Sequence, residues 1–447
     1  MAAFFSGSII LSLMLAMLVG FSYAQRHWGV HPEITRKGVH VGMGLVTLSF
    51  PWVFDSVLPV VVLAAIAVLS LFLIRSVKLI KKRAGSALSE VDRGGLGEIY
   101  FPIGVAIVFV WAQGDALLYA IPILILTFAD TLAALVGRFD GKLFFTTHEG
   151  HKTIEGSMAF LIMAMICIGV PLATFSDQSL SNVMLISLLL GVLIMLFEAI
   201  SWAGIDNVLI PVFSFLLLKK YISLDETNIA LHLGVLALLL AALVLWRYFS
   251  SLRTEAVLIA TLYGYFAWAI AGTEWLLIAF LALVSYPFLT PQRKALTQRH
   301  GMHVVFYVAG SGAFWLALSQ SWHSDSLFFA YCLTFAAHLA AICLIRHKAV
   351  SPETSTLWIV FVSVLKALAV IFVPYFIFTG IHSSQLWLAL FAFFLILTVA
   401  AVFARLLPNL KNYHEHIGRD RWHLQTGIVF LSACVGIVPF LIVTESI

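Results

Sequence analysis

From position 130 to 152 the sequence places a carboxylate deep in an apolar run and three cations beyond it. Asp130 lies well inside this run, in LTFADTLAALVGRFDGK, and Arg138, Lys142 and Lys152 follow it. An ionisable side chain at that depth is costly and needs a partner or a cavity, so Asp130 is a candidate catalytic residue. The three cations could bind phosphate, with Lys152 as a second catalytic candidate. Each cation alone could instead anchor the chain at a membrane surface.

The block HKTIEGS, at 151–157, leads directly into the next apolar run. Thr153, Gly156 and Ser157 would therefore stand at the start of a helix, where free backbone N–H groups favour phosphate. Glu155 is a further catalytic candidate in this block. A threonine with a glutamate close behind it is also ordinary helix-start chemistry, and that alternative stays open.

Three more oxygen-bearing side chains lie beyond this segment. Glu198 closes an apolar run in MLFEAISW, and Asp206 and Asn207 open the next one in GIDNVLIPVF. Together with Asp130 they are hard oxygen ligands of the kind that suits Mg²⁺, which prefers a few carboxylates plus substrate phosphates. Cations, a helix start and carboxylates are the parts that phosphoryl transfer needs. The sequence has no G-x-x-x-x-G-K-[ST] motif, so a P-loop enzyme is excluded.

The composition indicates what kind of fold must hold these residues. Of 447 residues, 62% are hydrophobic and only 11% are charged, against about 25% in an average soluble domain. Continuous apolar runs of roughly 20 residues predict an all-α polytopic membrane protein with about 14–16 transmembrane helices. Four cysteines lie inside apolar runs without paired spacing, which predicts buried thiols rather than disulfides. We expect the first apolar run to be a retained span rather than a signal peptide.

Basic loops orient the predicted spans. The segment 74–95 carries six Lys or Arg residues and should be cytoplasmic by the positive-inside rule. Alternation then places the 137–156 loop, and with it the candidate active site, on the cytoplasmic side. The polar segment KKYISLDET at 219–227 predicts a division into a first membrane domain, 1–220, and a second multi-span domain, 221–447.

Four blocks in residues 30–220 resemble a known family. ADTLAALVGRFDGK followed by HKTIEGS looks like the signature of the CTP-dependent isoprenoid-alcohol kinases, which include phytol, farnesol and dolichol kinases. RKGVHVGMG at 36–44, GEIYFPIGV at 97–105 and FEAISWAGIDNVLIP at 198–211 resemble further segments of that family, in the same order.

The resemblance implies transfer of the γ-phosphoryl group of CTP to a membrane isoprenoid alcohol, with Mg²⁺. On that basis Asp130, Glu198 and Asp206 would hold the metal, with Asn207, or activate the hydroxyl. Lys152, Lys142 and Arg138 would grip the phosphates, with Thr153, Gly156 and Ser157 at the helix start. The cytoplasmic mouth of the site would be lined by Arg36, Lys37, His40 and Glu98. For Arg36 and Lys37, anchoring at the membrane edge is the alternative.

Residues 221–447 resemble no family, and the sequence does not choose a role for them. Lys366 and His338 lie mid-span in this half, where a partner, a cavity or a neutral form is expected. Three alternatives to an isoprenoid-alcohol kinase remain: a cytidylyltransferase that forms CDP-lipids, a diacylglycerol kinase, and a transporter. A transporter would predict inverted repeats, and the two halves show no such symmetry.

Overall fold

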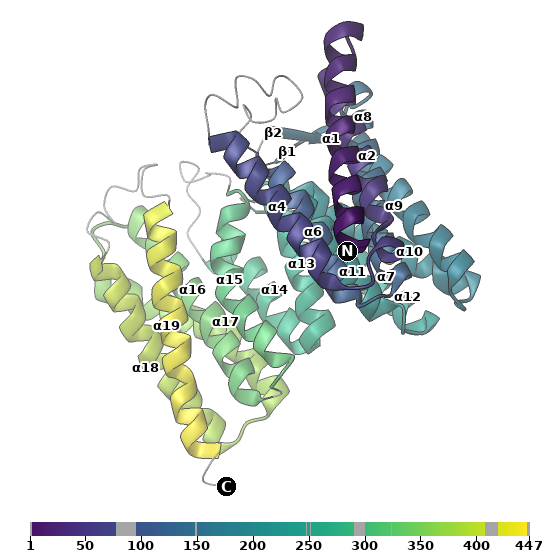
Figure 1. Ribbon diagram of the computed structural model, residues 1–447. Coiled ribbons are helices and arrows are strands. Elements are labelled where there is room, and N and C mark those ends of the chain that lie inside the picture. The colour runs from purple at the N-terminus through teal and green to yellow at the C-terminus, as the bar shows by residue number, and fades with distance from the viewer. Residues whose placement is uncertain are drawn as a thin grey trace. The chain divides into compact units, whose positions relative to one another are not determined.

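The computed structural model describes residues 2–76, 95–147, 150–246, 248–250, 252–289, 300–322, 324–406 and 419–444. Their regular structure consists of helices and one two-stranded antiparallel sheet (Figure 1). Eleven of the described helices are long and apolar enough to cross a membrane, and three further apolar helices are shorter. The predicted all-α polytopic membrane architecture is therefore confirmed.

The chain forms two compact units, residues 1–234 and 235–447, called unit 1 and unit 2 below. Unit 1 contains all the candidate site residues from the first half of the sequence. Its elements are α1 (Ala2–Trp28), α2 (Pro32–Leu48), α3 (Phe50–Val53), α4 (Val57–Ser76), α6 (Gly97–Ala112), α7 (Ala116–Leu124), η2 (Ile125–Ala129), α8 (Asp130–Phe139), β1 (Phe144–Thr147), β2 (Gly150–Thr153), α9 (Ile154–Phe175), α10 (Leu180–Ile200), α11 (Asp206–Tyr221) and the first part of α12 (Glu226–Trp246). The sequence predicted a kinase-like domain at 1–220 and a second domain without an assigned role at 221–447, and these roles stay predictions.

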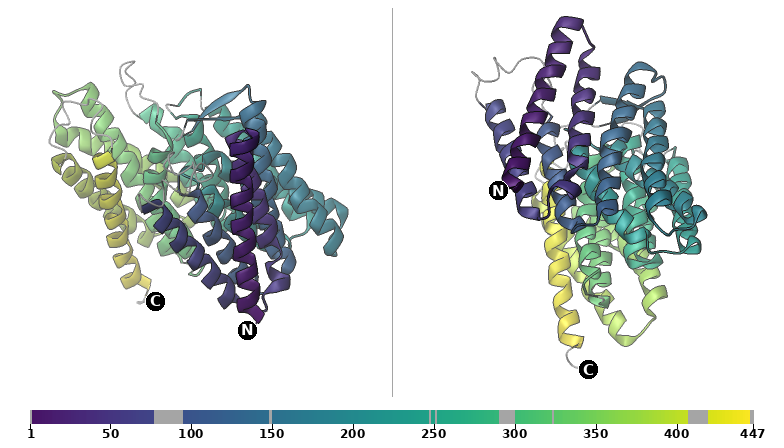
Figure 2. Two further views of the ribbon diagram at one scale, coloured as in Figure 1. Left: turned by 45° about the horizontal axis from the view of Figure 1, so that its top comes forward. Right: turned by 45° about the vertical axis from the view of Figure 1, so that its right-hand side comes forward.

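Helix α2 begins earlier than its apolar run. The side chain of His31 accepts the N–H of Glu33 at 3.2 Å and caps the helix, and Pro32 at the first position has no N–H to satisfy. Arg36 and Lys37 therefore lie within the helix and not on its approach. Helix α2 runs beside α1, as Figures 1 and 2 show.

The span that carries Asp130 contains a π-helical turn. Residues Ala116–Phe139 form one continuous apolar span in which η2 separates α7 from α8. At the end of the turn the N–H of Asp130 bonds to the carbonyl of Ile125, five residues back. A π turn inserts one residue into a helix and is frequent at functional sites. Asp130 is thus the first residue after the irregularity.

The charged block before α9 forms a hairpin, which was not predicted. Strands β1 and β2 pair antiparallel, with Phe145 opposite Lys152 and Phe144 opposite Thr153. Gly150 at the turn has a φ of 130°, a value that side-chain-bearing residues rarely adopt. Because neighbouring strand residues point to opposite faces, Lys152 and Thr153 face different parts of unit 1.

Unit 2 is a second helical bundle, built around α16. Its helices are α13 (Thr254–Ala271), α14 (Thr273–Leu289), α15 (Met302–Ser319), α16 (Asp325–Val350), α17 (Thr356–Thr379), α18 (Ser383–Leu406) and α19 (Arg419–Thr444), with the end of α12. Helix α16 is almost entirely buried and packs against α14, α15, α17, α18 and α19. Such a helix is apolar all round, which explains its lack of an amphipathic pattern.

Candidate functional site

A buried ion pair joins α2 to the start of α8. Lys37 Nζ lies 2.7 Å from Asp130 Oδ2 and donates a second, longer hydrogen bond of 3.3 Å to the carbonyl of Asp130. The two residues are only 3% and 7% exposed. The expectation that Asp130 needs a partner is met by Lys37. The sequence had placed Lys37 at the mouth of the site or at the membrane edge, whereas the structure buries it.

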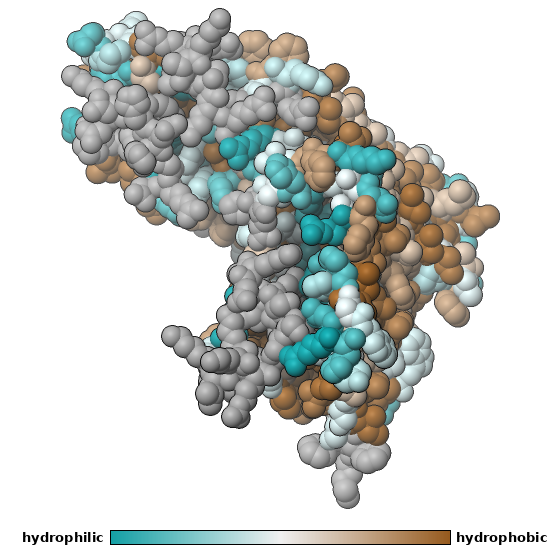
Figure 3. All heavy atoms as spheres, turned by 90° about the horizontal axis from the view of Figure 1, so that it is seen from above, coloured by the Kyte–Doolittle hydropathy of each residue, from teal (hydrophilic) through white to brown (hydrophobic). Residues whose placement is uncertain are grey.

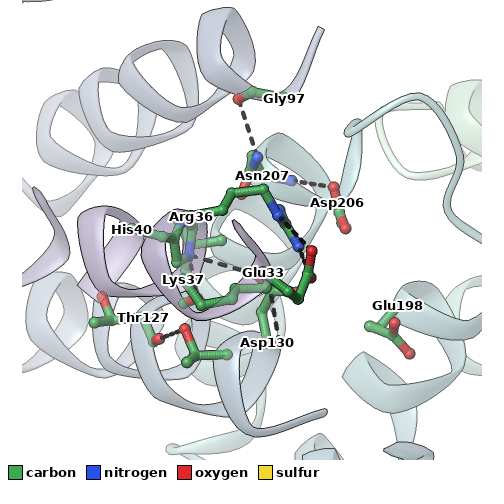
Figure 4. A network of polar contacts seen from close by, with 12 residues as sticks. Glu33, Arg36, Lys37, His40, Gly97, Thr127, Asp130, Glu198, Asp206 and Asn207 are labelled. Carbon is green, nitrogen blue, oxygen red and sulfur yellow. Dashed lines mark hydrogen bonds and ion pairs between the residues drawn. The ribbon is translucent and has the colours of Figure 1, made fainter. Parts of the chain in front are cut away.

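His40 lies one helical turn beyond Lys37 and contacts the same carboxylate. Its Nε2 is 3.4 Å from Asp130 Oδ2 and 2.9 Å from the carbonyl oxygen of Leu126, in the π turn. Both neighbours are acceptors, so Nε2 must carry a proton. Lys37 and His40 therefore fix the orientation of the Asp130 carboxylate from one side of α2 (Figure 4).

The close approach of α2 and η2 depends on a glycine. A Cβ on Gly44 would stand 2.0 Å from Thr127 Oγ1, too close for any side chain. The hydroxyl of Thr127 in turn donates to the carbonyl of Ile123 at 2.6 Å. This contact, which the sequence did not reveal, brings the helix that carries Lys37 and His40 against the turn that carries Asp130.

A second ion pair links the hairpin to the end of α10. Lys152 Nζ lies 2.7 Å from Glu198 Oε1 and also donates to the Glu198 carbonyl and, at 3.4 Å, to Ser201 Oγ. Burial alone would lower the pKa of the Lys152 ammonium, but the carboxylates of Glu198 and Asp206 outweigh it and raise that pKa above its usual value. Lys152 therefore stays positively charged within electrostatic reach of three candidate carboxylates, those of Glu198, Asp206 and Asp130.

The carboxyl group of Asp206 is within electrostatic reach of both ion pairs. The charges of Asp130, Lys37, Lys152 and Glu198 all act on its carboxyl group. In Figure 4, Asp206 and Asn207 at the start of α11 lie on one side of the Lys37–Asp130 pair, and Glu198 lies apart from both. The structure therefore brings the predicted carboxylates into one region of unit 1.

Asn207 offers an oxygen that the described protein does not use. Its Nδ2 donates to the carbonyl of Gly97 at 3.0 Å, which fixes the amide orientation, and its buried Oδ1 has no hydrogen-bond partner among the described residues. The adjacent Asp206 carboxylate accepts the Asn207 N–H at 3.1 Å. An orphaned amide oxygen beside a carboxylate fits Mg²⁺, which binds through one or two carboxylates plus substrate phosphates.

The four predicted metal ligands are not equivalent. Asp130 and Glu198 are each paired with a lysine, whereas no lysine among the described residues forms such a pair with Asp206 or Asn207. Within the described residues no group of three or more His, Cys, Asp or Glu side chains could hold a metal ion. Binding of a metal by all four residues therefore stays a prediction.

The start of α9 is held against α8 by small residues. Thr153 caps α9 by accepting the N–H of Gly156 at 3.1 Å. A Cβ on Gly156 would stand 2.9 Å from the carbonyl of Ala133, and one on Gly141 would clash with Thr153. Gly156 therefore allows α9 to approach α8 closely. The N–H of Gly156, one of the groups expected to bind phosphate, already donates to the capping side chain of Thr153.

The remaining residues of this block lie around the hairpin. Glu155 accepts the N–H of Leu143 at 3.1 Å and ties the base of β1 to α9. Ser157 is half-buried in the first turns of α9, and Arg138 and Lys142 are exposed at the end of α8 and in the loop that follows. The two exposed cations could reach a nucleotide at this surface. Seen from the end at which the hairpin lies in Figure 1, hydrophilic side chains form a band on this face (Figure 3).

Of the other predicted mouth residues, Arg36 has a local partner. Its guanidinium group donates two hydrogen bonds to the carboxylate of Glu33, one of them from Nε to Oε2 at 3.3 Å. Glu98 is half-buried in the first turn of α6, next to Gly97. The sequence analysis missed Glu33, although its spacing of three from Arg36 is typical of helical ion pairs, and it missed Ser201, three residues after Glu198.

The two polar residues singled out in the second half have structural partners. His338 lies between Ser311 Oγ, 3.3 Å from its Nε2, and Gln425 Nε2, 3.0 Å from its Nδ1. Lys366 donates to the carbonyl of Leu289 at 3.1 Å and contacts His347 Nε2 at the same distance. Each expectation of a partner is met within unit 2.

Comparison with known proteins gives one relationship. No family model matches the chain, and no solved structure matches it. A phytol kinase from Synechocystis sp. is 26% identical over 223 residues, which cover 48% of this chain and 88% of that protein. The resemblance inferred from the motifs is therefore supported at the level of a distant, phytol kinase-like relationship over about half of the chain.

Proposed function

We propose that unit 1 is a lipid-alcohol kinase that transfers the γ-phosphoryl group of CTP to the hydroxyl of a membrane isoprenoid alcohol such as phytol. The observation that carries this proposal is the buried Lys37–Asp130 pair, with its 2.7 Å contact, beside His40 and within electrostatic reach of Asp206. The distant similarity to a phytol kinase supports the same reaction. CTP as donor and an isoprenoid as acceptor rest on the family resemblance.

Asp130 is the proposed base. In the reaction the alcohol oxygen forms a bond to the γ-phosphorus, the bond from that phosphorus to the β–γ bridging oxygen breaks, and CDP leaves. The hydroxyl proton passes to the carboxylate of Asp130. Lys37 and His40 both contact Oδ2 and so hold this carboxylate in one orientation. A positioned base of this kind contributes about 10²–10⁴-fold to rate.

Lys152 is the proposed phosphate ligand at the centre of the site. Its ammonium would exchange part of its bonding to Glu198 for the transferred phosphoryl group, whose charge it neutralises. Arg138 and Lys142 would bind the outer phosphates, with Thr153, Gly156 and Ser157 at the start of α9. Glu155, proposed as catalytic from the sequence, would act by holding the hairpin in place.

Mg²⁺ is the proposed cofactor. Asp206 and Asn207 would hold it, and Asp130 and Glu198, each paired with a lysine, are the further predicted ligands. When bound, Mg²⁺ would neutralise phosphate charge. We place the site at the cytoplasmic face, where the nucleotide is available, with Arg36 and Glu98 near its mouth. This placement rests on the positive-inside rule and the basic loops.

The test uses purified protein in detergent with Mg²⁺ and γ-labelled CTP or ATP. Phytol, geranylgeraniol, a long polyprenol and diacylglycerol would be offered in parallel. We expect label from CTP in an isoprenoid monophosphate, with a loss of at least about 100-fold in Asp130→Asn. Lys152→Ala should lose about 10–100-fold at a CTP concentration below the KM. The exposed residues Asp177 and Lys219 provide matched controls, Asp177→Asn and Lys219→Ala, which should remain active.

The other outcomes identify the alternatives. Label in diacylglycerol alone would make the protein a diacylglycerol kinase. Release of pyrophosphate with formation of a CDP-lipid would make it a cytidylyltransferase. Folded protein that turns over no nucleotide with any of these lipids would contradict the kinase.

A further inference from the structure

Lys37 has one more N–H donor than its contacts with the protein use. A lysine ammonium group carries three such donors. Lys37 Nζ donates to Asp130 Oδ2 at 2.7 Å and to the Asp130 carbonyl at 3.3 Å, and no third hydrogen bond to it is found among the described residues. The Lys37 side chain is only 4% exposed. A donor on a buried cation is costly to leave unbonded, which indicates a further acceptor at this position.

The carboxylate of Asp130 indicates where that acceptor would lie. Lys37 and His40 both contact Oδ2, which leaves Oδ1 to receive the proton of the lipid hydroxyl in the proposed reaction. Both oxygens belong to one carboxylate. A hydroxyl within hydrogen-bond distance of Oδ1 therefore brings the phosphorus that it attacks close to Lys37 Nζ. The oxygens of the transferred phosphoryl group would then lie within reach of the third N–H.

The residues on one side of the Lys37–Asp130 pair suit the rest of such a ligand. Asp206 and Asn207 lie there in Figure 4, and the charge of Lys37 acts on the carboxyl group of Asp206. The buried Oδ1 of Asn207 has no hydrogen-bond partner among the described residues. The same region thus offers one unused donor and one unused acceptor. A phosphate group that carries a divalent cation has the complementary groups for both.

The second lysine of the site has no donor to spare. Lys152 Nζ makes three contacts, two with Glu198 and one with Ser201 Oγ at 3.4 Å. It can bind a phosphate only if it gives one of them up. Lys37 can bind a phosphate and keep both of its hydrogen bonds to Asp130. It could therefore hold the proposed base and contact the transferred group at the same time.

We propose that Lys37 is a catalytic residue whose third N–H donates to an oxygen of the γ-phosphoryl group during its transfer. This inference rests on the proposed function. A lysine suits the role because its compact ammonium group binds phosphate as a point charge. When the alcohol oxygen attacks the γ-phosphorus and CDP leaves, the hydroxyl proton passes to Asp130, and Lys37 keeps its own three protons. The carboxyl group is then neutral, so the charge of Lys37 acts more strongly on the phosphoryl group.

Nucleotide binding without turnover separates this contact from the orientation of Asp130. The probes are β,γ-methylene-CTP and CDP with Mg²⁺, measured by equilibrium dialysis against full-length protein in nanodiscs without a lipid alcohol. Asp130→Asn is compared with Lys37→Met/Asp130→Asn, because neither variant has a carboxylate for Lys37 to orient. We expect the added Lys37→Met to weaken binding of β,γ-methylene-CTP at least about tenfold and binding of CDP less than about twofold, since CDP lacks the γ-phosphoryl group.

Lys348→Met is the matched control. Lys348 is a buried lysine of unit 2 that likewise donates two hydrogen bonds, to the carbonyls of Pro352 and Thr354 at 2.8 Å each. Its replacement should change neither dissociation constant. Melting temperatures measured in parallel show whether each variant is folded. If Asp130→Asn does not fold, wild-type protein takes its place beside the double variant, which buries no unpaired charge, and the same selective loss is expected.

The kinase assay of wild-type protein distinguishes the two ways in which this inference could fail. If the wild-type protein is an active kinase but the added Lys37→Met weakens both nucleotides equally, or neither, Lys37 only orients Asp130 and the inference is overturned. If the wild-type protein binds neither nucleotide and phosphorylates no lipid alcohol, the proposed function fails and the inference fails with it.

Discussion

Lys37 Nζ lies 2.7 Å from Asp130 Oδ2, although the two residues are separated by 93 positions in the chain. Both are buried, so the contact ties α2 to the π turn in the interior of unit 1. Bringing two charges out of water costs several kcal/mol per ion, and their attraction repays this only in good geometry. The contribution of the pair to stability and its proposed role in orienting Asp130 can therefore be tested separately.

Exchanging the pair for apolar residues should separate stability from activity. Lys37→Met alone leaves a buried carboxylate without its main partner and should lower the free energy of unfolding by about 3–5 kcal/mol. The double variant Lys37→Met/Asp130→Leu should recover most of that loss, because apolar replacement of a buried pair is often neutral or stabilising. Both variants should be inactive. Thermal unfolding in detergent and the kinase assay measure the two effects.

If the double variant kept its activity, neither residue could take part in the reaction. If it remained as unstable as Lys37→Met, the pair would be a structural requirement of unit 1. Asp177→Asn serves as the control, since Asp177 is exposed.

The glycine contact between α2 and η2 gives a second prediction. Gly44→Ala would place a Cβ 2.0 Å from Thr127 Oγ1, so α2 must move away from the turn. We expect a destabilisation of about 1–3 kcal/mol, typical of overpacking, together with a loss of kinase activity as Lys37 separates from Asp130. Gly20→Ala in α1, where a Cβ would meet nothing within 4 Å, should be neutral or slightly stabilising.

The double variant Gly44→Ala/Thr127→Ala is the internal check, because it removes two of the three atoms nearest the new Cβ. Partial recovery of melting temperature and activity relative to Gly44→Ala would show that the two sites are coupled. Additive losses would mean that the contact does not set the position of α2.

The sequence predicted the helical membrane fold because lipid requires long apolar helices, and length and composition report this directly. It also predicted that Asp130 needs a partner. It did not identify Lys37 as that partner, because a contact across 93 residues depends on packing that no local pattern encodes. Lys37 adjoins Arg36 at the edge of an apolar run, which also suits a membrane anchor.

The π turn and the hairpin were missed for a different reason. Pro122 is the one local irregularity that the sequence shows within the 116–136 run, and a proline does not by itself predict a π turn. The strands β1 and β2 have only four residues each, too short for alternation to be distinguished from a polar loop. Both features position candidate residues, since Asp130 follows the turn and Lys152 lies in β2.

Lys152 should contribute to nucleotide binding through its charge at every working pH. Glu198 and Asp206 raise the pKa of its ammonium above the usual 10.5, so the charge is present below that value and is lost only as the pH rises through the higher one. Lys152→Ala should raise the KM for CTP by about 10–100-fold, the worth of a charge-assisted hydrogen bond of about 1.5–3 kcal/mol. The increase should be the same at pH 6.5 and pH 8.5.

An increase in KM that disappeared at pH 8.5 would show that Lys152 titrates in this range and would contradict the assigned environment. Lys152→Arg is informative because it keeps the charge but not the compact shape, and it should recover only part of the loss. Lys219→Ala, at an exposed cation outside the site, should leave the KM unchanged.

The orphaned oxygen of Asn207 leads to a prediction about Mg²⁺. If Asp206 and Asn207 hold the metal that accompanies the nucleotide, Asp206→Asn and Asn207→Ala should each raise the Mg²⁺ concentration for half-maximal activity by at least about tenfold. Asn182 is a matched control: it is buried, its Oδ1 also lacks a partner among the described residues, and its Nδ2 donates to a backbone carbonyl at 3.2 Å. Asn182→Ala should therefore cost similar stability without changing the Mg²⁺ requirement.

Titration of Mg²⁺ at saturating CTP, with melting temperatures measured in parallel, distinguishes ligation from folding. Equal Mg²⁺ requirements for Asn207→Ala and Asn182→Ala would remove Asn207 from the metal site. If Asp130→Asn or Glu198→Gln, but not Asp206→Asn, could be rescued by high Mg²⁺, the metal would be held by the lysine-paired carboxylates. The paired lysines would then have to move away when the nucleotide binds, because one carboxylate oxygen cannot bond a lysine and a small, rigidly coordinated ion equally well.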